Sequence, residues 1–354
     1  MVIGNPPYVE YSENKFSYKI IANTYLTYPS KNLYSLVFEK AKKILHTKSR
    51  IGMIVQISSV STPSMETMVR EIKRNSNLNW LSNYATRPAY LFDGVTMNLT
   101  IIISEILKSE DKYQPIIFSS NYLRWNPEYR QHLFQYIPLT KVQNDKLIFN
   151  FSIPKLKFEF ENDILGKLLS QKKPISHYLE PTKSRTNQEL FYRTAGGRYF
   201  KVFVDQDFGS ESKSNKSKFF QSKYNVYVMI SLLSSDIWWW YYTLHFDMYN
   251  CKDYMMYGFL FNYEDCTQLS KLESLGKKLS KDLLKNAEEK LQTYSTTGER
   301  MQLIFRPSYS KHIIDEIDNV LADHYKLTAE ELDYIVNYDI KYRMGKELEN
   351  GEDE

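Results

Sequence analysis

Apolar residues recur at helical and strand-like spacings along the first third of the chain. In residues 32–45 they return every three or four positions, which predicts an amphipathic helix. Residues 50–56 are a nearly continuous apolar run, typical of a strand that is buried on both faces of a sheet. Residues 99–107 predict a second strong strand. A further helix is predicted at 64–74 and a strand at 78–84. This alternation of helices and strands indicates an α/β layer on a mostly parallel sheet.

The pattern changes after about residue 110. Short apolar and aromatic pieces there alternate with polar turns, which indicates a second region of mixed α and β structure. Further along, apolar residues at helical spacing predict helices over 265–290 and 311–325, and Thr328 has capping-box spacing to Glu331 ahead of another helix. The predicted segments are an α/β layer at 1–110, an α+β domain at 111–262 and a helical segment at 263–354.

Composition excludes several classes of protein. Of the 354 residues, 42% are hydrophobic and 25% are charged, which is too apolar for a disordered chain. The 2 cysteines exclude a disulfide framework and a cysteine-based zinc site, and the 6 histidines show no metal-binding spacing. Since no signal peptide and no run of about 18 uncharged apolar residues is found, the sequence predicts a cytoplasmic protein without a membrane span.

Charge and aromatic residues are unevenly distributed. The net charge is only +4, but residues 167–223 contain 12 Lys and Arg against 5 Asp and Glu, a surplus that can face an anion. The candidates for phosphate contacts are Lys183, Arg185, Arg193, Arg198 and Lys201, although scattered basic residues also occur on any solvated face. Aromatic residues make up 15% of the chain, and three consecutive tryptophans at 238–240 cannot all face one way on a helix. At least one of them is expected in the core.

The tetrapeptide Asn5-Pro6-Pro7-Tyr8 follows a short apolar strand and is the sharpest chemical signal. The Asn5 side-chain oxygen and the Pro6 carbonyl are two hydrogen-bond acceptors, and the two proline rings hold them rigidly. The tyrosine ring lies beside them. This arrangement suits a planar ring with an exocyclic amine, because the acceptors bind the amine hydrogens and leave the nitrogen lone pair facing an electrophile. An isolated Asn-Pro-Pro-Tyr is otherwise a common turn.

The chain here resembles the amino-group DNA methyltransferases, in particular the fused restriction–modification enzymes. Their (Asn/Asp)-Pro-Pro-Tyr motif is matched residue for residue by 5–8. The predicted helix and strand that follow are similar to the segment after this motif in the family. Residues 91–95 resemble a later motif of the same enzymes, 231–242 resemble a TaqI-type target-recognition domain, and 332–345 resemble the C-terminal end.

The resemblance implies methyl transfer from S-adenosylmethionine to N6 of an adenine flipped out of double-stranded DNA. It implies that Asn5 and the Pro6 carbonyl bind the amine, that Pro7 makes the loop rigid and that Tyr8 stacks on the base. Phe92 is a candidate second stacking wall, or else a core residue at the foot of the next strand. The implied fold is a partial Rossmann-like methyltransferase sheet, followed by an α+β target-recognition domain and C-terminal helices.

One part of the family pattern is missing from the sequence. The S-adenosylmethionine site of these enzymes includes a Gly-x-Gly loop, and no two of the 12 glycines here are separated by a single residue. The resemblance therefore implies a partner polypeptide that carries the cofactor-binding half, or a chain that is a fragment of a longer or interrupted gene. Two other functions remain open, namely a DNA-specificity module that only binds DNA, and an RNA or protein methyltransferase.

Overall fold

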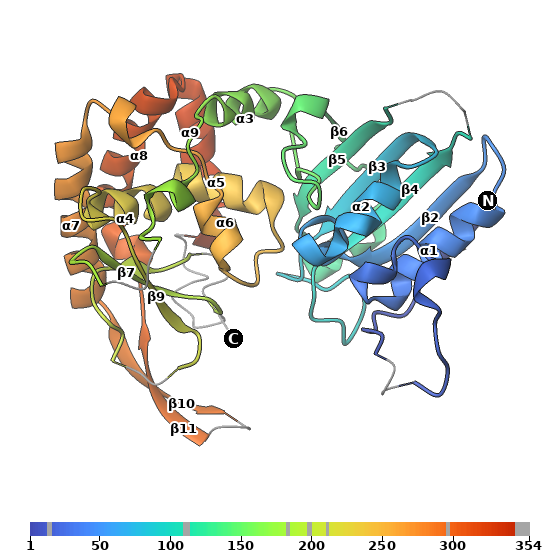
Figure 1. Ribbon diagram of the computed structural model, residues 1–354, viewed down its shortest axis with the longest axis horizontal. Helices are drawn as coiled ribbons and strands as arrows, with labels where there is room; N and C mark the ends of the chain where they lie inside the picture. The colour runs from blue at the N-terminus through green and yellow to red at the C-terminus, as the bar shows by residue number, and fades with distance from the viewer. Residues whose placement is uncertain are drawn as a thin grey trace. The chain divides into compact units, whose positions relative to one another are not determined.

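The computed structural model describes residues 1–12, 16–108, 114–181, 185–196, 200–209, 212–294 and 298–343. Its contacts divide the chain into two compact units (Figure 1). The first unit comprises Met1–Leu165 with Thr243–Asp247, and the second comprises Gly166–Tyr242 with Met248–Glu354. The sequence divides the chain by function into residues 1–110, 111–262 and 263–354. That division stays a prediction.

A six-stranded mixed sheet forms the centre of the first unit, in the order β1-β2-β4-β3-β5-β6 (Figure 1). Its strands are β1 (Val2–Gly4), β2 (Arg50–Gln56), β3 (Ser76–Tyr84), β4 (Leu99–Ile106), β5 (Ile116–Leu123) and β6 (Thr140–Val142). β1 is parallel to β2 and β3 is parallel to β5, whereas β4 is antiparallel to both of its neighbours. β6 is antiparallel to β5. With its helices, this sheet is the partial Rossmann-like α/β layer that the sequence predicts.

The prediction of a mostly parallel sheet was wrong for β4. A parallel neighbour of β3 would need a crossover, usually a helix, and the loop that joins β3 to β4 contains none. The predicted burial of residues 50–56 on both faces also holds only in part. Ile51, Met53 and Val55 are buried, whereas the residues that alternate with them are half-buried or exposed.

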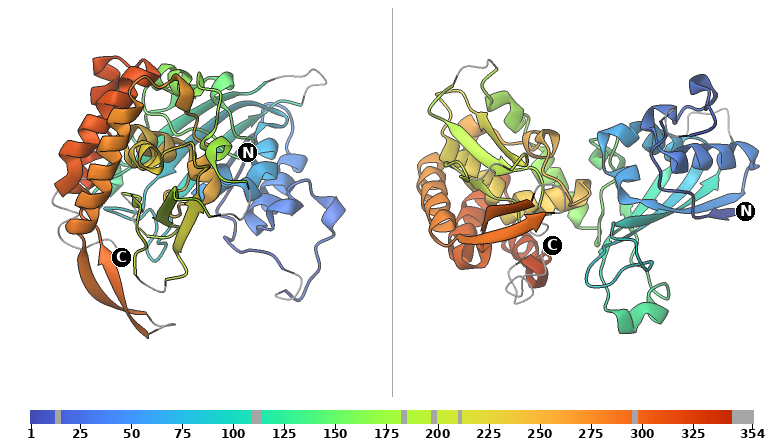
Figure 2. Two further views of the ribbon diagram at one scale, coloured as in Figure 1. Left: turned by 60° about the vertical axis from the view of Figure 1, so that its left-hand side comes forward. Right: turned by 90° about the horizontal axis from the view of Figure 1, so that it is seen from below.

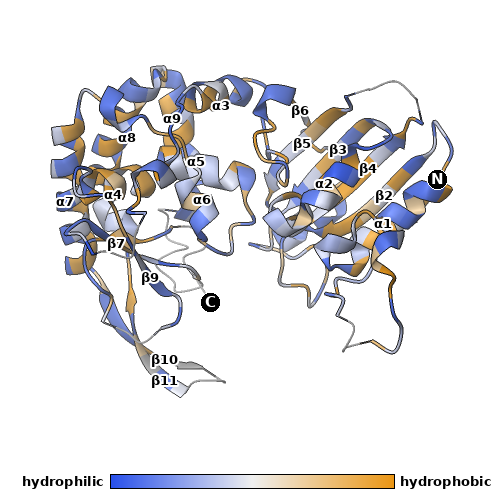
Figure 3. Ribbon diagram, in the orientation of Figure 1, coloured by the Kyte–Doolittle hydropathy of each residue, from blue (hydrophilic) through white to orange (hydrophobic). Residues whose placement is uncertain are grey.

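Two helices of the first unit, α1 (Leu33–Ile44) and α2 (Glu66–Lys73), lie over one face of the sheet (Figures 1 and 2). α1 forms because its apolar residues recur at helical spacing, and it buries Tyr34, Leu36 and Phe38. α2 buries Met68, Val69 and Ile72. Figure 3 shows hydrophobic residues concentrated along the strands that these helices cover. Burial of this apolar stripe positions the sheet and both helices.

The second unit combines a three-stranded antiparallel sheet, a long ribbon and helices (Figure 1). The sheet has the order β8-β7-β9, with β7 (Glu189–Arg193), β8 (Phe203–Val204) and β9 (Asn215–Phe219), and the ribbon pairs β10 (Glu288–Tyr294) with β11 (Gly298–Ile304). The helices are α4 (Val226–Ser234), α6 (Asp253–Tyr257), α7 (Leu269–Lys285), α8 (Lys311–Tyr325), α9 (Ala329–Asn337) and α10 (Ile340–Arg343). Two more helices, α3 (Glu161–Leu169) and α5 (Asp236–His245), contain residues of both units.

Local sequence signals explain several of these helices. α8 has the bounds predicted from its isoleucine spacing, and the Thr328 hydroxyl and Glu331 carboxylate form the predicted capping box of α9. α7 ends earlier than predicted, at Lys285, because the residues from Glu288 onward pair with β11 instead. All three tryptophans at 238–240 are buried. None of the described helices has the length and apolar character that a membrane span requires.

The core of the second unit is closely packed. A Cβ atom at Gly276 in α7 would lie 1.9 Å from the Tyr227 carbonyl oxygen of α4, so only glycine allows these helices to approach this closely. The Asp318 carboxylate of α8 accepts hydrogen bonds from the backbone N–H groups of Asp236 and Ile237, each at 3.2 Å, and so caps the start of α5. Arg343 of α10 forms a buried ion pair with Asp236.

Candidate active site

The carboxyl ends of β1, β2, β3 and β5 meet at one edge of the first unit's sheet, since these four strands run in the same direction. The tetrapeptide Asn5-Pro6-Pro7-Tyr8 leaves β1 at this edge, the 85–98 loop leaves β3, and the 124–139 segment leaves β5. Ligand sites of open α/β sheets lie at the carboxyl ends of strands. We therefore call this edge the candidate active site.

Tyr8 is held at this edge by contacts on two sides. Its hydroxyl donates to the Ile54 carbonyl oxygen of β2 at 3.2 Å, and its ring meets Tyr34 of α1 edge to face, with centroids 6.2 Å apart. Burial raises the pKa of Tyr8 to about 12, so the phenol stays neutral at physiological pH. The half-buried ring is thus fixed and uncharged, as a stacking surface requires.

The two acceptors of the tetrapeptide are uncommitted. The Asn5 side chain is exposed and Pro6 is buried. Neither the Asn5 amide nor the Pro6 carbonyl has a hydrogen-bond partner within the ranges that the structure describes. Asn5 and Pro6 lie close to Tyr8 in the chain and leave β1 at the same edge of the sheet. That these groups bind an exocyclic amine stays a prediction.

Phe92 lies on the same side of the unit as Tyr8. Both rings pack against an apolar cluster, here called the edge cluster, which consists of the buried residues Tyr84, Ala89, Leu91, Leu99 and Trp125. Phe92 is only partly buried. The structure thus brings the tetrapeptide and Phe92 to one cluster, and Phe92 combines a core contact with an accessible ring.

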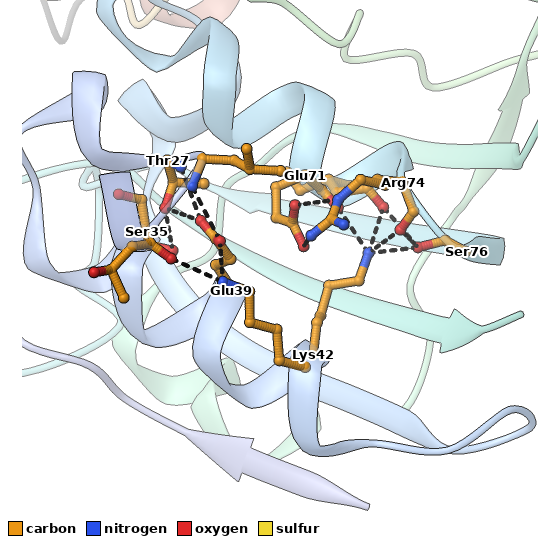
Figure 4. Close-up of polar contacts among 11 residues, drawn as sticks. Thr27, Ser35, Glu39, Lys42, Glu71, Arg74 and Ser76 are labelled. Atoms are coloured by element: carbon orange, nitrogen blue, oxygen red, sulfur yellow. Dashed lines mark hydrogen bonds and ion pairs between the residues drawn. The ribbon is translucent and has the colours of Figure 1, made fainter. Parts of the chain in front are cut away.

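Two buried polar residues of α1, Glu39 and Lys42, anchor neighbouring segments of the first unit (Figure 4). The Glu39 carboxylate accepts hydrogen bonds from the backbone N–H groups of Leu26 at 3.0 Å and Thr27 at 2.8 Å, and from the Thr27 hydroxyl at 2.8 Å. Lys43 forms an ion pair with Glu39 at 2.7 Å. Burial alone would raise the pKa of Glu39, but the hydrogen bonds from Lys43, Thr27 and Leu26 outweigh it and lower this pKa. Glu39 thereby anchors the loop that directly follows Tyr8 in sequence.

Lys42 makes the second anchor. Its ammonium group donates to the Glu71 carbonyl at 2.7 Å, to the Ser76 hydroxyl at 2.9 Å and to the Arg74 carbonyl at the end of α2. Burial lowers the pKa of Lys42 to about 8. A cation at the C-terminal end of a helix satisfies carbonyls that have no partner within that helix. Lys42 therefore joins α1 to α2 and has a structural role.

The basic residues predicted to contact phosphates lie in the second unit or outside the described ranges. Arg193 donates to the Leu303 carbonyl oxygen at 2.7 Å and lies over the rings of Phe208 and Phe305. Lys201 is buried and donates to the Gly196 carbonyl oxygen at 2.9 Å. Both cations contact protein groups, which favours a structural role for them. Arg185 is exposed, whereas Lys183 and Arg198 lie outside the described residues.

Three arginines near the edge cluster were missed from the sequence. The Arg130 guanidinium donates to the Tyr90 carbonyl at 3.1 Å and the Leu91 carbonyl at 2.8 Å. Arg124 donates to the Arg87 carbonyl at 3.5 Å, and the Arg87 guanidinium lies 5.6 Å from the centre of the Tyr90 ring. These residues come from two segments far apart in sequence, so a count of local charge does not find them. Arg87 closely follows the strand predicted at 78–84, which was the available signal for it; no strand was predicted ahead of Arg124 and Arg130.

A group of acidic side chains in the second unit also comes together. Asp236, Asp315 and Asp318 have carboxylate oxygens within 4.8 Å of one another. Lys311 and Arg343 form ion pairs with this group, and burial together with the Asp236 charge raises the pKa of Asp318 well above its usual value. Lys311 and Arg343 pair with Asp236 and Asp315, and the raised pKa of Asp318 favours its neutral form. We therefore interpret the group as an ion-pair network of the core.

Residues 1–90 match the family model described as "Eco57I restriction-modification methylase". This match covers the tetrapeptide, both helices on the sheet and strands β1 to β3. It supports a DNA methyltransferase at the level of the family for this part of the chain. No curated protein matches the chain.

Solved structures with a detectable likeness include restriction–modification enzymes. A nuclease-deletion mutant of the Type ISP enzyme LlaGI with a DNA substrate mimic is 13% identical, with 56% of this chain and 18% of that chain covered and a TM-score of 0.34. The ATP-dependent Type ISP enzyme LlaBIII bound to DNA is 10% identical, with 98% and 37% covered and a TM-score of 0.40. The DrdV–DNA complex is 10% identical, with 99% and 55% covered and a TM-score of 0.38. The chain thus spans from 18% to 55% of these three structures.

Proposed function

We propose that this chain binds and orients the target adenine of a site-specific DNA methyltransferase of the restriction–modification or phage-defence type. The observation that carries the proposal is the pair of uncommitted acceptors, Asn5 and the Pro6 carbonyl, beside the fixed ring of Tyr8. This group lies in the segment that matches a restriction–modification methylase family model. The reaction proposed is methyl transfer from S-adenosylmethionine to adenine N6 in duplex DNA.

Each residue of the tetrapeptide has a distinct role in this proposal. Asn5 and the Pro6 carbonyl accept the two hydrogens of the adenine amine, so the nitrogen lone pair turns out of the ring plane. Pro7 restricts the backbone that carries them. Tyr8 stacks on the flipped base as a neutral ring, since burial raises its pKa further above physiological pH. The side chains of this edge thus act through binding and orientation, and Phe92 provides a second wall.

The residues of this chain do not fit S-adenosylmethionine on their own. Close approach of backbone to that cofactor depends on the Gly-x-Gly loop, which the sequence lacks. We propose that a separate polypeptide, or a further part of a longer chain, provides the cofactor-binding half. The edge strand β1 supports this arrangement, because its Ile3 side chain is 73% exposed and a further strand can pair along an edge strand.

The remaining parts of the proposal follow from the resemblance. Residues 1–110 form the catalytic part, 111–262 select the DNA sequence and 263–354 support them as a helical segment. Arg185, together with Lys183 and Arg198, contributes phosphate contacts from the region with the basic surplus. The site of action is the cytoplasm, where chromosomal and invading DNA are accessible.

Calorimetry of S-adenosylmethionine binding tests the proposal. The chain alone should give no heat of binding, and a mixture with the product of the gene immediately upstream should bind the cofactor. Binding to the chain alone would overturn the assignment of the cofactor site. If neither sample gives a heat of binding, the second candidate is favoured, a DNA-specificity module without catalysis. The missing Gly-x-Gly also supports this candidate. Competition between duplex DNA, RNA and protein substrates separates the third candidate, an RNA or protein methyltransferase.

A further inference from the structure

The 124–139 segment connects two antiparallel neighbours, β5 and β6, and is much longer than the two to five residues that a hairpin needs. It includes a short 3-10 helix, Pro127–His132, and projects away from the sheet in the right-hand view of Figure 2. Three of its aromatic side chains are exposed, with exposed fractions of 58% for Tyr129, 57% for Phe134 and 82% for Tyr136. Apolar rings in water are a cost that folding normally removes.

The base of this segment is firmly attached beside the candidate active site. Trp125 belongs to the edge cluster and Leu133 packs against it. The Phe134 ring meets Tyr84 of that cluster edge to face, with centroids 5.9 Å apart. Arg130 ties the segment to the 85–98 loop through the carbonyls of Tyr90 and Leu91. The segment is therefore fixed next to the cluster that also supports Tyr8 and Phe92, while its outer rings face solvent.

Charge indicates which partner these rings would meet. Arg124 and Arg130 lie in the segment, where Glu128 is the single carboxylate. The adjoining 85–98 loop adds Arg87 and Asp93, so cations still outnumber carboxylates. Exposed aromatic rings among cationic groups are typical of surfaces that bind unstacked nucleotides, because rings stack on bases and cations attract phosphates. A protein-binding patch would instead be expected to have a continuous apolar centre with few charges.

We propose that the 124–139 segment is a base-stacking arm, in which Tyr129, Phe134 and Tyr136 stack on DNA bases that lose their neighbours when a nucleotide leaves the helix. This inference rests on the proposed function, since flipping of the target adenine creates such unstacked bases. Flipping costs a few kcal/mol of stacking and pairing, which lowers the population of the flipped state. Aromatic rings that stack on the exposed bases offset part of that cost.

The test compares two DNA probes with the full chain. Fluorescence anisotropy measures the binding of a labelled 30-base-pair duplex with one central abasic position, and of the same duplex fully paired. The wild-type chain should bind the abasic duplex more tightly. The double variant Tyr129→Ala/Tyr136→Ala should bind the abasic duplex about 5- to 100-fold more weakly, the range expected for loss of base–aromatic stacking, with the paired duplex within about twofold.

Two control variants make the result specific. Tyr136→Phe keeps the ring and should bind like the wild type, because stacking does not require the hydroxyl. Tyr309→Ala removes a ring of the second unit that is 55% exposed, and it should leave both affinities unchanged. Circular dichroism of every variant checks the fold; the substituted side chains are largely exposed, so we expect no loss of structure.

The outcomes separate this inference from the proposed function. The proposal of a stacking arm would be overturned if the wild type and the double variant bound the abasic duplex with equal affinity. It would also be overturned if the wild type failed to bind DNA. A loss confined to the abasic duplex would support it even if the chain and its cofactor half methylate nothing. Conversely, a double variant that methylates and binds like the wild type would refute the arm and leave the proposed function standing.

Discussion

Substitution of Glu39 by alanine probes the anchor of the loop that follows the tetrapeptide. The side chain is fully buried and its carboxylate accepts hydrogen bonds from the backbone N–H groups of Leu26 and Thr27. Alanine leaves both donors without this acceptor, and an orphaned buried donor costs about 1–3 kcal/mol. The Leu26 donor is only partly buried, so its loss of an acceptor should cost less than that of the buried Thr27 donor. For the two donors together we expect a local destabilisation of about 2–4 kcal/mol.

Hydrogen–deuterium exchange with mass spectrometry measures this change directly. A local loss of about 2–4 kcal/mol corresponds to about 30- to 1000-fold faster amide exchange, since 1.36 kcal/mol is a factor of ten. The faster exchange should be confined to peptides covering residues 20–31. Glu66→Ala is the matched control, because Glu66 lies on α2 and forms a surface ion pair with Arg70, so its loss should change protection less than threefold.

Two results would refute the reasoning on Glu39. Unchanged exchange in residues 20–31 of Glu39→Ala would mean that the carboxylate does not hold the loop. Equal acceleration in both variants would mean that the effect is not specific to the buried carboxylate. Acid should reproduce the substitution: the pKa of Glu39 is lowered on folding, so its contribution is complete above the unfolded pKa and is lost as pH falls through the folded pKa.

Other substitutions test the packing and the edge of the sheet. Gly276→Ala should destabilise the second unit by about 1–3 kcal/mol or more in urea denaturation, because the new methyl group meets the Tyr227 carbonyl; an unchanged midpoint would contradict the close approach. Burial lowers the pKa of Lys155 to about 7, so the unfolded state binds more protons above pH 7 and stability should rise between about pH 7 and 10.5. Lys155→Met should remove that slope, and an identical slope in both proteins would exclude Lys155 as its cause. Ile3→Asp at the free edge of β1 should weaken binding of the cofactor-binding half at least about tenfold in calorimetry, and unaltered affinity would place that half elsewhere.

Sequence patterns predicted the parts of the fold that depend on local interactions. The spacing of apolar residues places α1 and α8 within one residue of their ends, and the Thr328–Glu331 capping box forms as the sequence indicates. These elements satisfy their own backbone groups and bury one continuous stripe, so a short window of sequence is sufficient to find them.

The rest depended on contacts between distant segments. The antiparallel direction of β4 follows from the strands with which it pairs. The ribbon forms because β10 pairs with β11, in place of a longer helix. At the candidate site, the tetrapeptide was found because its four residues are adjacent in sequence. Arg124 and Arg130 were missed because they reach the carbonyls of Arg87, Tyr90 and Leu91 only after the 85–98 loop and the 124–139 segment have packed together. For the same reason, a local surplus of charge did not reveal that Lys201 is buried.

Methylation of DNA by the chain together with its cofactor-binding half tests the central claim most directly. Radioactive methyl groups from S-adenosylmethionine are followed into duplex DNA, and mass spectrometry of the digested DNA identifies the methylated base. We expect N6-methyladenine with the wild-type chain, and a loss of about 10²- to 10³-fold in rate for Asn5→Ala, with DNA binding largely retained. Turnover by Asn5→Ala at the wild-type rate, or a methylated base other than adenine, would contradict it.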